Sequence, residues 1–326
     1  MKLKAIFESG ILAMLFMSSL AAPPPSQQVP STSRQLVGEE NVNQALSKED
    51  ENQLSKAVKM NAASFVFQTA IVFASNAKLL GGKTNPEVNE DYPSLMTPAG
   101  YAFSIWGAIY AWEFLMVAQP FFQTPTGNHR SAIVSSSPYF VSANVLQAFW
   151  ALTFAHEKIA LSTVFLTAIA VNMARAVTVM GVSTPREKRF WFLAAPSSLH
   201  AGWVAAASIV SFNLALVAEK GSSASQISLA FNSLALALVA GFTAFKQLPP
   251  GSDALYSGAI SWGLVAIAEE LHKKVLPRID PACREGLQGT ALLYGGFLAA
   301  ASFAAAVLSG TKWKFWNNSG HLHLHK

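Results

Sequence analysis

The chain has 326 residues, of which 52% are hydrophobic and only 13% are charged. A soluble domain usually carries about a quarter charged residues, so this composition indicates an integral membrane protein with the lipid bilayer as its main partner. The net charge of +5 is scattered, without a basic stripe interleaved with aromatic residues, so nucleic acid is not expected as a partner. Cys283 is the only cysteine, which excludes an intramolecular disulfide framework and a thiolate zinc cluster.

Residues 1–22 have the order of features typical of a secretory signal peptide. Lys2 and Lys4 give a positive start, an apolar stretch follows, and small residues surround the end of that stretch. We predict cleavage near Ala21 or Ala22, and the alternative is an uncleaved signal anchor. The membrane itself stays open between the secretory pathway, a plastid and another organelle.

Residues 23–58 form a polar segment that we expect to act as a flexible spacer. Its first part is rich in Pro, Ser and Gln, and its second part, from residue 39, turns acidic and has a helical pattern. Nothing in this segment suggests catalysis. At the other end of the chain, residues 311–326 form a polar tail.

Eight apolar runs separated by short polar breaks occupy the rest of the chain. Each is long enough, at a rise of about 1.5 Å per residue, for a helix that crosses a bilayer. They cover residues 61–79, 98–119, 138–156, 159–181, 196–217, 226–246, 254–273 and 286–308. The sequence therefore predicts an all-α integral membrane protein with about eight transmembrane helices, five in a core at 59–217 and three more at 218–310. Lysine and arginine divide nearly evenly between the two sets of loops, which leaves the orientation open.

Small residues recur at every fourth position in the last run, at Gly296, Ala300 and Ala304. Ala259 and Gly263 do the same in the seventh run. This spacing predicts close approach of neighbouring helices in a membrane. A general richness in alanine is the alternative explanation.

The second run carries a row of aromatic residues that ends in a carboxylate. Pro98 and Gly100 give the run a bent start. One helical face then presents Phe103, Trp106, Tyr110 and Glu113. Because a carboxylate is costly inside a bilayer, Glu113 is expected to point into protein. A packing face with a buried glutamate and a ligand-binding face are both open.

Two further runs have faces of the same kind. Gln147 and Trp150 share a face with Phe154 in the third run, and His200 shares a face with Trp203 in the fifth. Aromatic walls with a few convergent polar groups are the usual make-up of a small-molecule site. We therefore expect the three faces to line one cavity.

The second run, YPSLMTPAGYAFSIWGAIYAWEF, resembles the second helix of the TspO/translocator-protein superfamily. That helix has a Pro-Gly, then a Phe, then a Trp-x-x-x-Tyr signature. The matching residues here are Pro98, Gly100, Phe103, Trp106 and Tyr110.

Two other runs are similar to helices of the same superfamily. The third looks like its Asn-x-x-Trp helix, with Trp150 matching and Gln147 where Asn is usual. The fifth looks like its Tyr-Leu-x-Trp-Val helix, with Trp203 matching and His200 in place of Tyr. The likeness is closest to the longer, tryptophan-rich relatives that carry extra helices, and it covers about residues 60–217.

The resemblance implies a five-helix bundle with a pocket for tetrapyrroles, sterols or similar flat, hydrophobic ligands. Members are described as transport, sensing or stress proteins. No cofactor is certain, and a porphyrin or haem is the ligand implied, for which His200 is either an iron ligand or a structural histidine. A homodimer is kept among the expected partners. The candidate ligand-binding residues are Pro98, Phe103, Trp106, Tyr110, Glu113, Gln147, Trp150, His200 and Trp203.

An enzyme and a secondary transporter are two other classes of function for such a chain. The apolar runs contain no GxSxG elbow, no HExxH pair and no paired aspartates, so an enzyme is not expected. A proton- or ion-coupled secondary transporter of a small metabolite is the alternative function, with Glu113 and Arg175 as its charged residues. Inverted repeats would favour a transporter, and none is visible in the sequence.

Counting along the helices predicts one buried charged layer. Glu113, Arg175 and His200 fall at nearly equal depth, about a third of the way through the bilayer. Because a paired charge is tolerated there better than a lone one, we hypothesise that Glu113 pairs with Arg175 and that His200 is the third member. Alternatively, Arg175 extends to the interface and Glu113 stays protonated.

Overall fold

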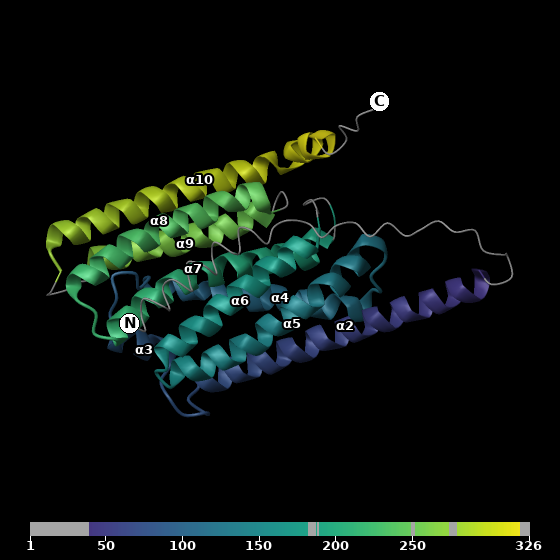
Figure 1. The fold of residues 1–326 in the computed structure, drawn as a ribbon, viewed down its shortest axis with the longest axis horizontal. Helices are drawn as coiled ribbons and strands as arrows, with labels where there is room; N and C mark the ends of the chain where they lie inside the picture. The colour runs from purple at the N-terminus through teal and green to yellow at the C-terminus, as the bar shows by residue number, and fades with distance from the viewer. Residues whose placement is uncertain (1–38, 182–186, 188, 249–251, 274–278, 320–326) are drawn as a thin grey trace.

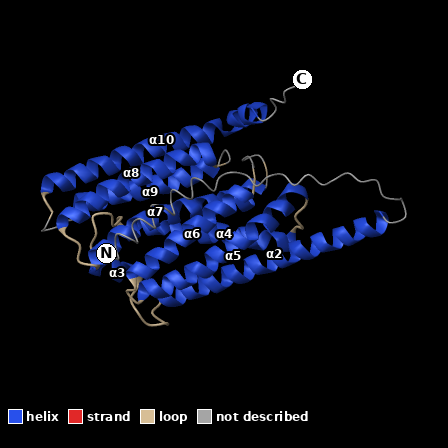
Figure 2. Cartoon of the chain, viewed as in Figure 1, coloured by secondary structure: helices blue, strands red, loops and turns tan. Residues whose placement is uncertain are grey.

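The computed structural model describes residues 39–181, 187, 189–248, 252–273 and 279–319, with the side chains of 39–47, 247 and 309–319 left out. These residues form an elongated bundle of helices that run along one common direction (Figures 1 and 2). Within the described ranges no strand is present. The fold is therefore all-α, as the apolar runs predict.

The described residues form nine α-helices joined by short connections. The first four are α2 (Glu39–Asn76), α3 (Asn85–Asp91), α4 (Ile105–Phe122) and α5 (Gly127–Ala155). They are followed by α6 (Ile159–Val179), α7 (Ala195–Ala218), α8 (Ser223–Gln247), α9 (Ser252–Lys273) and α10 (Pro281–Ser319). A 3₁₀ turn, η1 (Gly100–Ser104), leads into α4, and a short π-helical segment, η2 (Phe190–Ala194), leads into α7.

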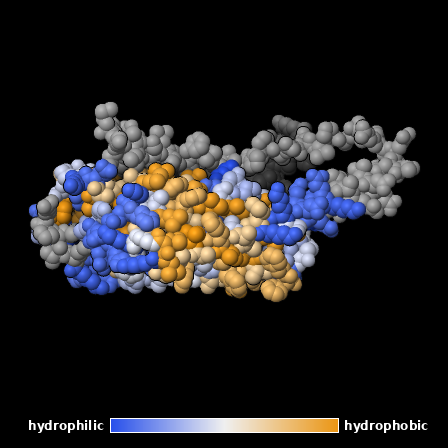
Figure 3. Space-filling view, turned by 90° about the horizontal axis from the view of Figure 1, so that it is seen from below, coloured by the Kyte–Doolittle hydropathy of each residue, from blue (hydrophilic) through white to orange (hydrophobic). Residues whose placement is uncertain are grey.

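Six of the described helical segments are long and apolar enough to cross a membrane, and they belong to α2, α4, α6, α7, α8 and α10. The remaining two expected spans, 138–156 and 254–273, correspond to α5 and α9, which are less hydrophobic but lie within the same bundle (Figure 1). Figure 3 shows hydrophobic side chains around the middle of the molecule and hydrophilic ones toward its ends. This distribution is that of a protein whose middle lies in lipid.

The helix α2 begins earlier than the span expected at 61–79. Residues 39–58, assigned to the spacer from their composition, form the first half of α2. Leu54 and Ala57 in this half are buried, and this apolar packing holds the segment in a helix. The helical pattern expected from residue 39 is therefore confirmed, whereas the expectation of a flexible spacer is wrong for residues 39–58. The predicted signal peptide at 1–22 and the end of the tail lie outside the described residues.

The helix α5 also begins earlier than expected. The apolar run was expected to start at residue 138, but α5 starts at Gly127 and contains Pro138 in its interior. A proline inside a membrane helix is tolerated where neighbouring groups satisfy the freed backbone. The backbone group that Pro138 leaves without its helical N–H donor is the carbonyl of Val134, one turn earlier. The predicted boundary at residue 138 is wrong by three turns.

The helix α7 lies between two groups of helices, with α2, α4, α5 and α6 on one side and α8, α9 and α10 on the other (Figure 1). Its approach to α9 is very close at Gly202, where an added Cβ would overlap the backbone carbonyl of Tyr256. Gly263 of α9 faces Ala206 and Trp203 of α7. The small residues predicted at Ala259 and Gly263 thus do lie in a tight helix interface.

The small residues of α10 behave differently. Gly296, Ala300 and Ala304 are exposed, and an added Cβ at Gly296 would meet nothing within 4 Å. The contact with α9 is made one residue earlier, at Gly295, whose carbonyl accepts a 2.7 Å hydrogen bond from Ser261. The prediction of a close interface along the Gly296 series is therefore wrong. Alanine richness explains that spacing.

Candidate functional site

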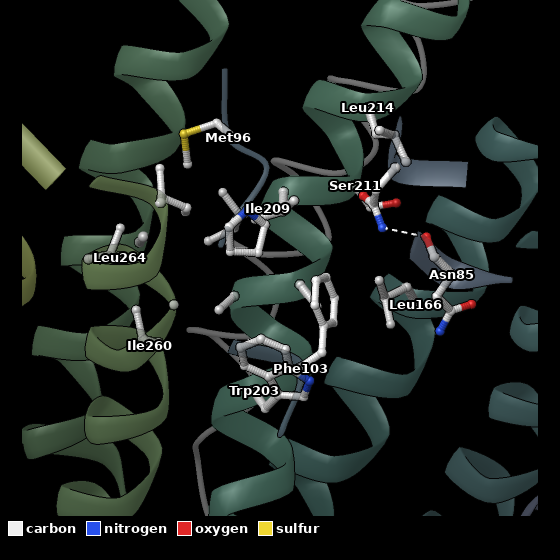
Figure 4. A pocket seen from close by; sticks show the side chains of 18 of the residues that line it. Asn85, Met96, Phe103, Leu166, Trp203, Ile209, Ser211, Leu214, Ile260 and Leu264 are labelled. Atoms are coloured by element: carbon white, nitrogen blue, oxygen red, sulfur yellow. Dashed lines mark hydrogen bonds between the residues drawn. The ribbon is translucent and has the colours of Figure 1, made fainter. Parts of the chain in front are cut away.

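An inner chamber with a cavity volume of about 70 Å³ lies between α7 and α9 and is closed by side chains of α4, α5 and α6. Figure 4 shows Ile260 and Leu264 of α9 on one side, Asn85 and Leu166 on the other, and Phe103 and Trp203 at one end. The walls are almost entirely apolar. The aliphatic residues that line it include Leu166, Ile209, Val210, Leu214, Ile260, Leu264 and Ile267.

A larger outer chamber, with a cavity volume of about 400 Å³, adjoins the inner one and is more polar. The two chambers share six lining residues: Asn85, Asn89, Pro98, Phe103, Trp106 and Trp150. Asn76, Glu90 and Glu270 line only the outer chamber. Since these residues belong to the ends of α2, α3 and α9, the outer chamber opens toward the end of the bundle where those helices meet.

The bent start of the second run places its aromatic side chains in the chambers. Pro98 and the η1 turn direct the chain past α9, where the amide of Ala99 donates to the carbonyl of Ala266 at 3.0 Å. The indole N–H of Trp262 donates to the carbonyl of Ala102 at 3.1 Å. These two bonds fix η1 against α9, so α9 controls where Phe103 and Trp106 lie.

Trp106 is the centre of an aromatic cluster. Its ring is stacked on Tyr110 with centroids 5.4 Å apart and on Trp150 with centroids 6.4 Å apart. It meets the edges of Trp203 at 6.3 Å and His200 at 5.5 Å. Offset and edge-to-face geometries of this kind are the favoured ones between aromatic rings. The cluster is the wall that the two chambers share.

A polar layer lies behind this aromatic wall and is fully buried. His200 Nδ1 and Glu113 Oε1 are 2.7 Å apart, and both side chains have no exposed surface. Nearby, the amide of Gln147 donates to the hydroxyl of Tyr110 at 2.8 Å. Glu113 Oε2, His200 Nε2 and Gln147 Oε1 find no hydrogen-bond partner among the described residues.

The predicted partner of Glu113 was Arg175, and this prediction is wrong. Glu113 pairs with His200 instead, and the Arg175 guanidinium lies 5.9 Å from the ring centroid of Tyr139 on α5. Counting residues gives depth along a helix but not its rotation or its neighbours. The helix α4 packs mainly against α2 and α7, so His200 of α7 meets Glu113 first.

The nine candidate residues separate into two groups. Six of them line a chamber: Pro98, Phe103, Trp106, Tyr110, Trp150 and Trp203. The other three, Glu113, Gln147 and His200, are completely buried behind the aromatic wall and line neither chamber. These three side chains support the aromatic wall from behind and do not present a polar atom to either chamber.

The short helix α3 covers the outer chamber and is held by surface polar groups. Thr84 and Glu87 form a capping box at its start. The hydrogen bond from Lys78, followed by those from Thr84, lowers the pKa of Glu87 to about 2. Lys83 donates to Asp91 at 2.7 Å and to Glu157 at 2.8 Å, which raises the pKa of Lys83 and ties α3 to the hairpin between α5 and α6.

Sequence reasoning did not identify the contributions of α3 and α9. Asn85 and Asn89 lie in a polar loop-like segment, where asparagine is common. Ile260, Gly263, Leu264 and Ile267 recur at helical spacing on α9, a signal that was available but that any buried helix gives. Phe154, which shares its predicted face with Trp150, does line the inner chamber.

The fold and cavity define the class as an all-helical, multi-pass integral membrane protein with an aromatic-lined pocket. The chain belongs to the TSPO-like protein family, whose model matches residues 58–309. No curated protein and no solved structure gives a match to the chain. The family match continues through α8, α9 and most of α10, whereas the resemblance in the sequence extended only to about residue 217.

Proposed function

We propose that the protein binds a hydrophobic, flat small molecule in the two adjoining chambers. The observation that carries this proposal is the aromatic wall around Trp106, which is shared by both chambers. Aromatic rings offer large flat surfaces for a planar ligand, and their N–H and O–H groups supply polar contacts. Tetrapyrroles and sterols, the ligands expected from the family resemblance, are flat molecules of this general kind.

A binding or carrier role fits the residues better than catalysis. The polar groups shared by the two chambers are the amides of Asn85 and Asn89 and the indoles of Trp106 and Trp150, which bind and orient ligands. The titratable pair Glu113–His200 lies behind Trp106, out of reach of a molecule in either chamber. We therefore propose a protein that transports, senses or stores its ligand, and not an enzyme.

Titration of the purified protein with porphyrin, steroid and polyene panels tests this proposal, with quenching of tryptophan fluorescence as the readout. Trp106→Leu and Trp203→Leu should each weaken binding by about 1 kcal/mol, or about fivefold. Trp191→Leu is the matched control, because Trp191 lies outside both chambers and is about half exposed. Unchanged affinity in both cavity variants, with correct folding, would move the site elsewhere.

The alternative function is proton-coupled transport, and one observation favours it. Glu113 and His200 form a buried titratable pair whose imidazole meets the edge of Trp106, so a change of protonation there is adjacent to the cavity wall. Proteoliposomes loaded with a pH-sensitive dye would test this function. Ligand-dependent proton movement that is absent in His200→Phe supports transport, and ligand uptake without proton movement excludes coupling.

A further inference from the structure

The residues described along the two chambers do not include the cationic side chains that a site for an anionic ligand would use. Among the described residues that line either chamber, none is a lysine, an arginine or a histidine. The inner chamber has no charged lining residue in the described part of the chain. The charged side chains that line the outer chamber are two carboxylates, Glu90 and Glu270.

These walls make a carboxylate-bearing ligand costly to bind. A carboxylate in the inner chamber would lose its hydration and meet no cation in return, which is expensive in an apolar environment. Placed instead at the outer chamber, it would approach the Glu90 carboxylate, a group of its own charge. Glu90 is exposed and has no ion-pair partner among the described residues, so its charge is not locally compensated.

The remaining polar groups at the chambers suit an uncharged molecule. Asn85 and Asn89 offer neutral amide groups at the boundary between the chambers. His200, the residue weighed as an iron ligand, lines neither chamber, and its Nδ1 is engaged by Glu113. Haem would therefore find neither an axial ligand nor a cation for its carboxylates along the described walls.

We propose that the ligand is uncharged: a flat or polycyclic lipid, or an esterified tetrapyrrole, and not a free porphyrin dicarboxylate or haem. This inference rests on the proposed function and narrows its ligand class. The Glu90 carboxylate at the opening of the outer chamber disfavours anions there, and the uncharged inner chamber provides no place for them further in. Ligands are therefore selected by charge at the opening of the outer chamber and by shape in the inner chamber.

A matched pair of probes isolates the charge, namely protoporphyrin IX and its dimethyl ester, which share one ring system. Both are titrated at pH 7 into purified full-length protein in detergent, with a detergent-only titration subtracted. The ester should bind at least about tenfold more tightly than the free acid, equivalent to about 1.4 kcal/mol. Equal affinities, or tighter binding of the acid, would overturn the inference and leave the proposed function standing.

A charge reversal at the opening of the outer chamber tests whether this opening selects against anions. Glu90→Lys should reduce the ester-to-acid affinity ratio at least about fivefold, because it replaces a repelling group with an attracting one. Glu219→Lys is the matched control, since Glu219 is exposed at the same end of the bundle but lines neither chamber. A ratio that Glu90→Lys leaves unchanged contradicts the inference. Failure of both probes and of the wider panels to bind above the detergent blank overturns the proposed function and this inference with it.

Discussion

The groups of helices on the two sides of α7 contribute different chemistry to one cavity. The side of α2, α4, α5 and α6 supplies the aromatic wall and, with α7, the buried polar layer. The side of α8, α9 and α10 supplies aliphatic side chains and the two hydrogen bonds that hold η1. The side of α2, α4, α5 and α6 thus has the groups that distinguish ligands. The second side, that of α8, α9 and α10, fixes the position of those groups. The cavity is incomplete without the second.

The largest effect is expected from breaking the buried pair on the first side. His200→Phe leaves the Glu113 carboxylate buried without a partner, and such a change costs about 3 kcal/mol or more of folding stability. Thermal unfolding in detergent measures it. The double variant Glu113→Gln with His200→Phe should cost less than the sum of the single changes. Additive costs would show that the two side chains act independently.

Next in size is the tight crossing between α7 and α9. Gly202→Ala places a Cβ against the backbone of Tyr256, which a side-chain rotation cannot relieve, so we expect a loss of about 1–3 kcal/mol. Gly107→Ala in α4 is the control, because an added Cβ there meets nothing within 4 Å. Chemical unfolding of both variants gives the comparison. Equal stability of the two variants would mean that α7 and α9 can shift apart at Gly202 without a measurable loss of stability.

A smaller effect, on binding more than on stability, is expected at Trp262. Trp262→Phe keeps an aromatic ring beside Tyr101 but removes the N–H that donates to the carbonyl of Ala102. Since η1 carries Phe103 into the cavity, ligand affinity should fall by about 1 kcal/mol, or about fivefold. Trp112→Phe is the control, because its indole donates to Trp191 away from the cavity. A fall of equal size in both variants would argue against positioning by α9.

The smallest effect is expected from acidifying the polar contacts around α3. Because its folded pKa is lowered to about 2 from 4.5, Glu87 contributes its stabilisation above its ordinary pKa and loses it as the pH falls toward about 2. Amide exchange in α3, corrected for intrinsic rates, should therefore increase between pH 5 and pH 3 relative to α6. Lys78→Met should remove most of this pH dependence. If it persists in that variant, another group anchors α3.

The helical class and most spans could be predicted from sequence because a bilayer imposes length and hydrophobicity on every crossing. The packing of the first half of α2 and the start of α5 could not be predicted in the same way. Leu54 and Ala57 are buried by tertiary contacts within a polar stretch, and Pro138 is accommodated inside a helix because its surroundings permit it. Both features depend on neighbours that hydropathy along one helix does not reveal.

The aromatic residues of the cavity were predictable and the aliphatic ones were not. Trp106, Trp150 and Trp203 are rare residues deep in apolar runs, so their faces are informative. Ile260 and Leu264 are common residues that look the same on any buried helix. The pairing of Glu113 with His200 was not predicted, because packing sets the rotation of α4 and α7 about their axes. Depth in the bilayer alone left Arg175 as an equal candidate for the partner of Glu113.

The length of α2 has a topological consequence. At about 1.5 Å per residue, its 38 residues extend about 57 Å, whereas the hydrocarbon layer is about 30 Å thick. Its C-terminal end lies beside the outer chamber, since Asn76 lines that chamber, so the surplus length projects at the opposite end of the bundle (Figure 1). The projecting N-terminal part of α2 and the opening of the outer chamber therefore face different aqueous compartments. A reagent that labels Lys48 or Lys56 and a ligand that enters past Glu90 have to be supplied from opposite sides of the membrane.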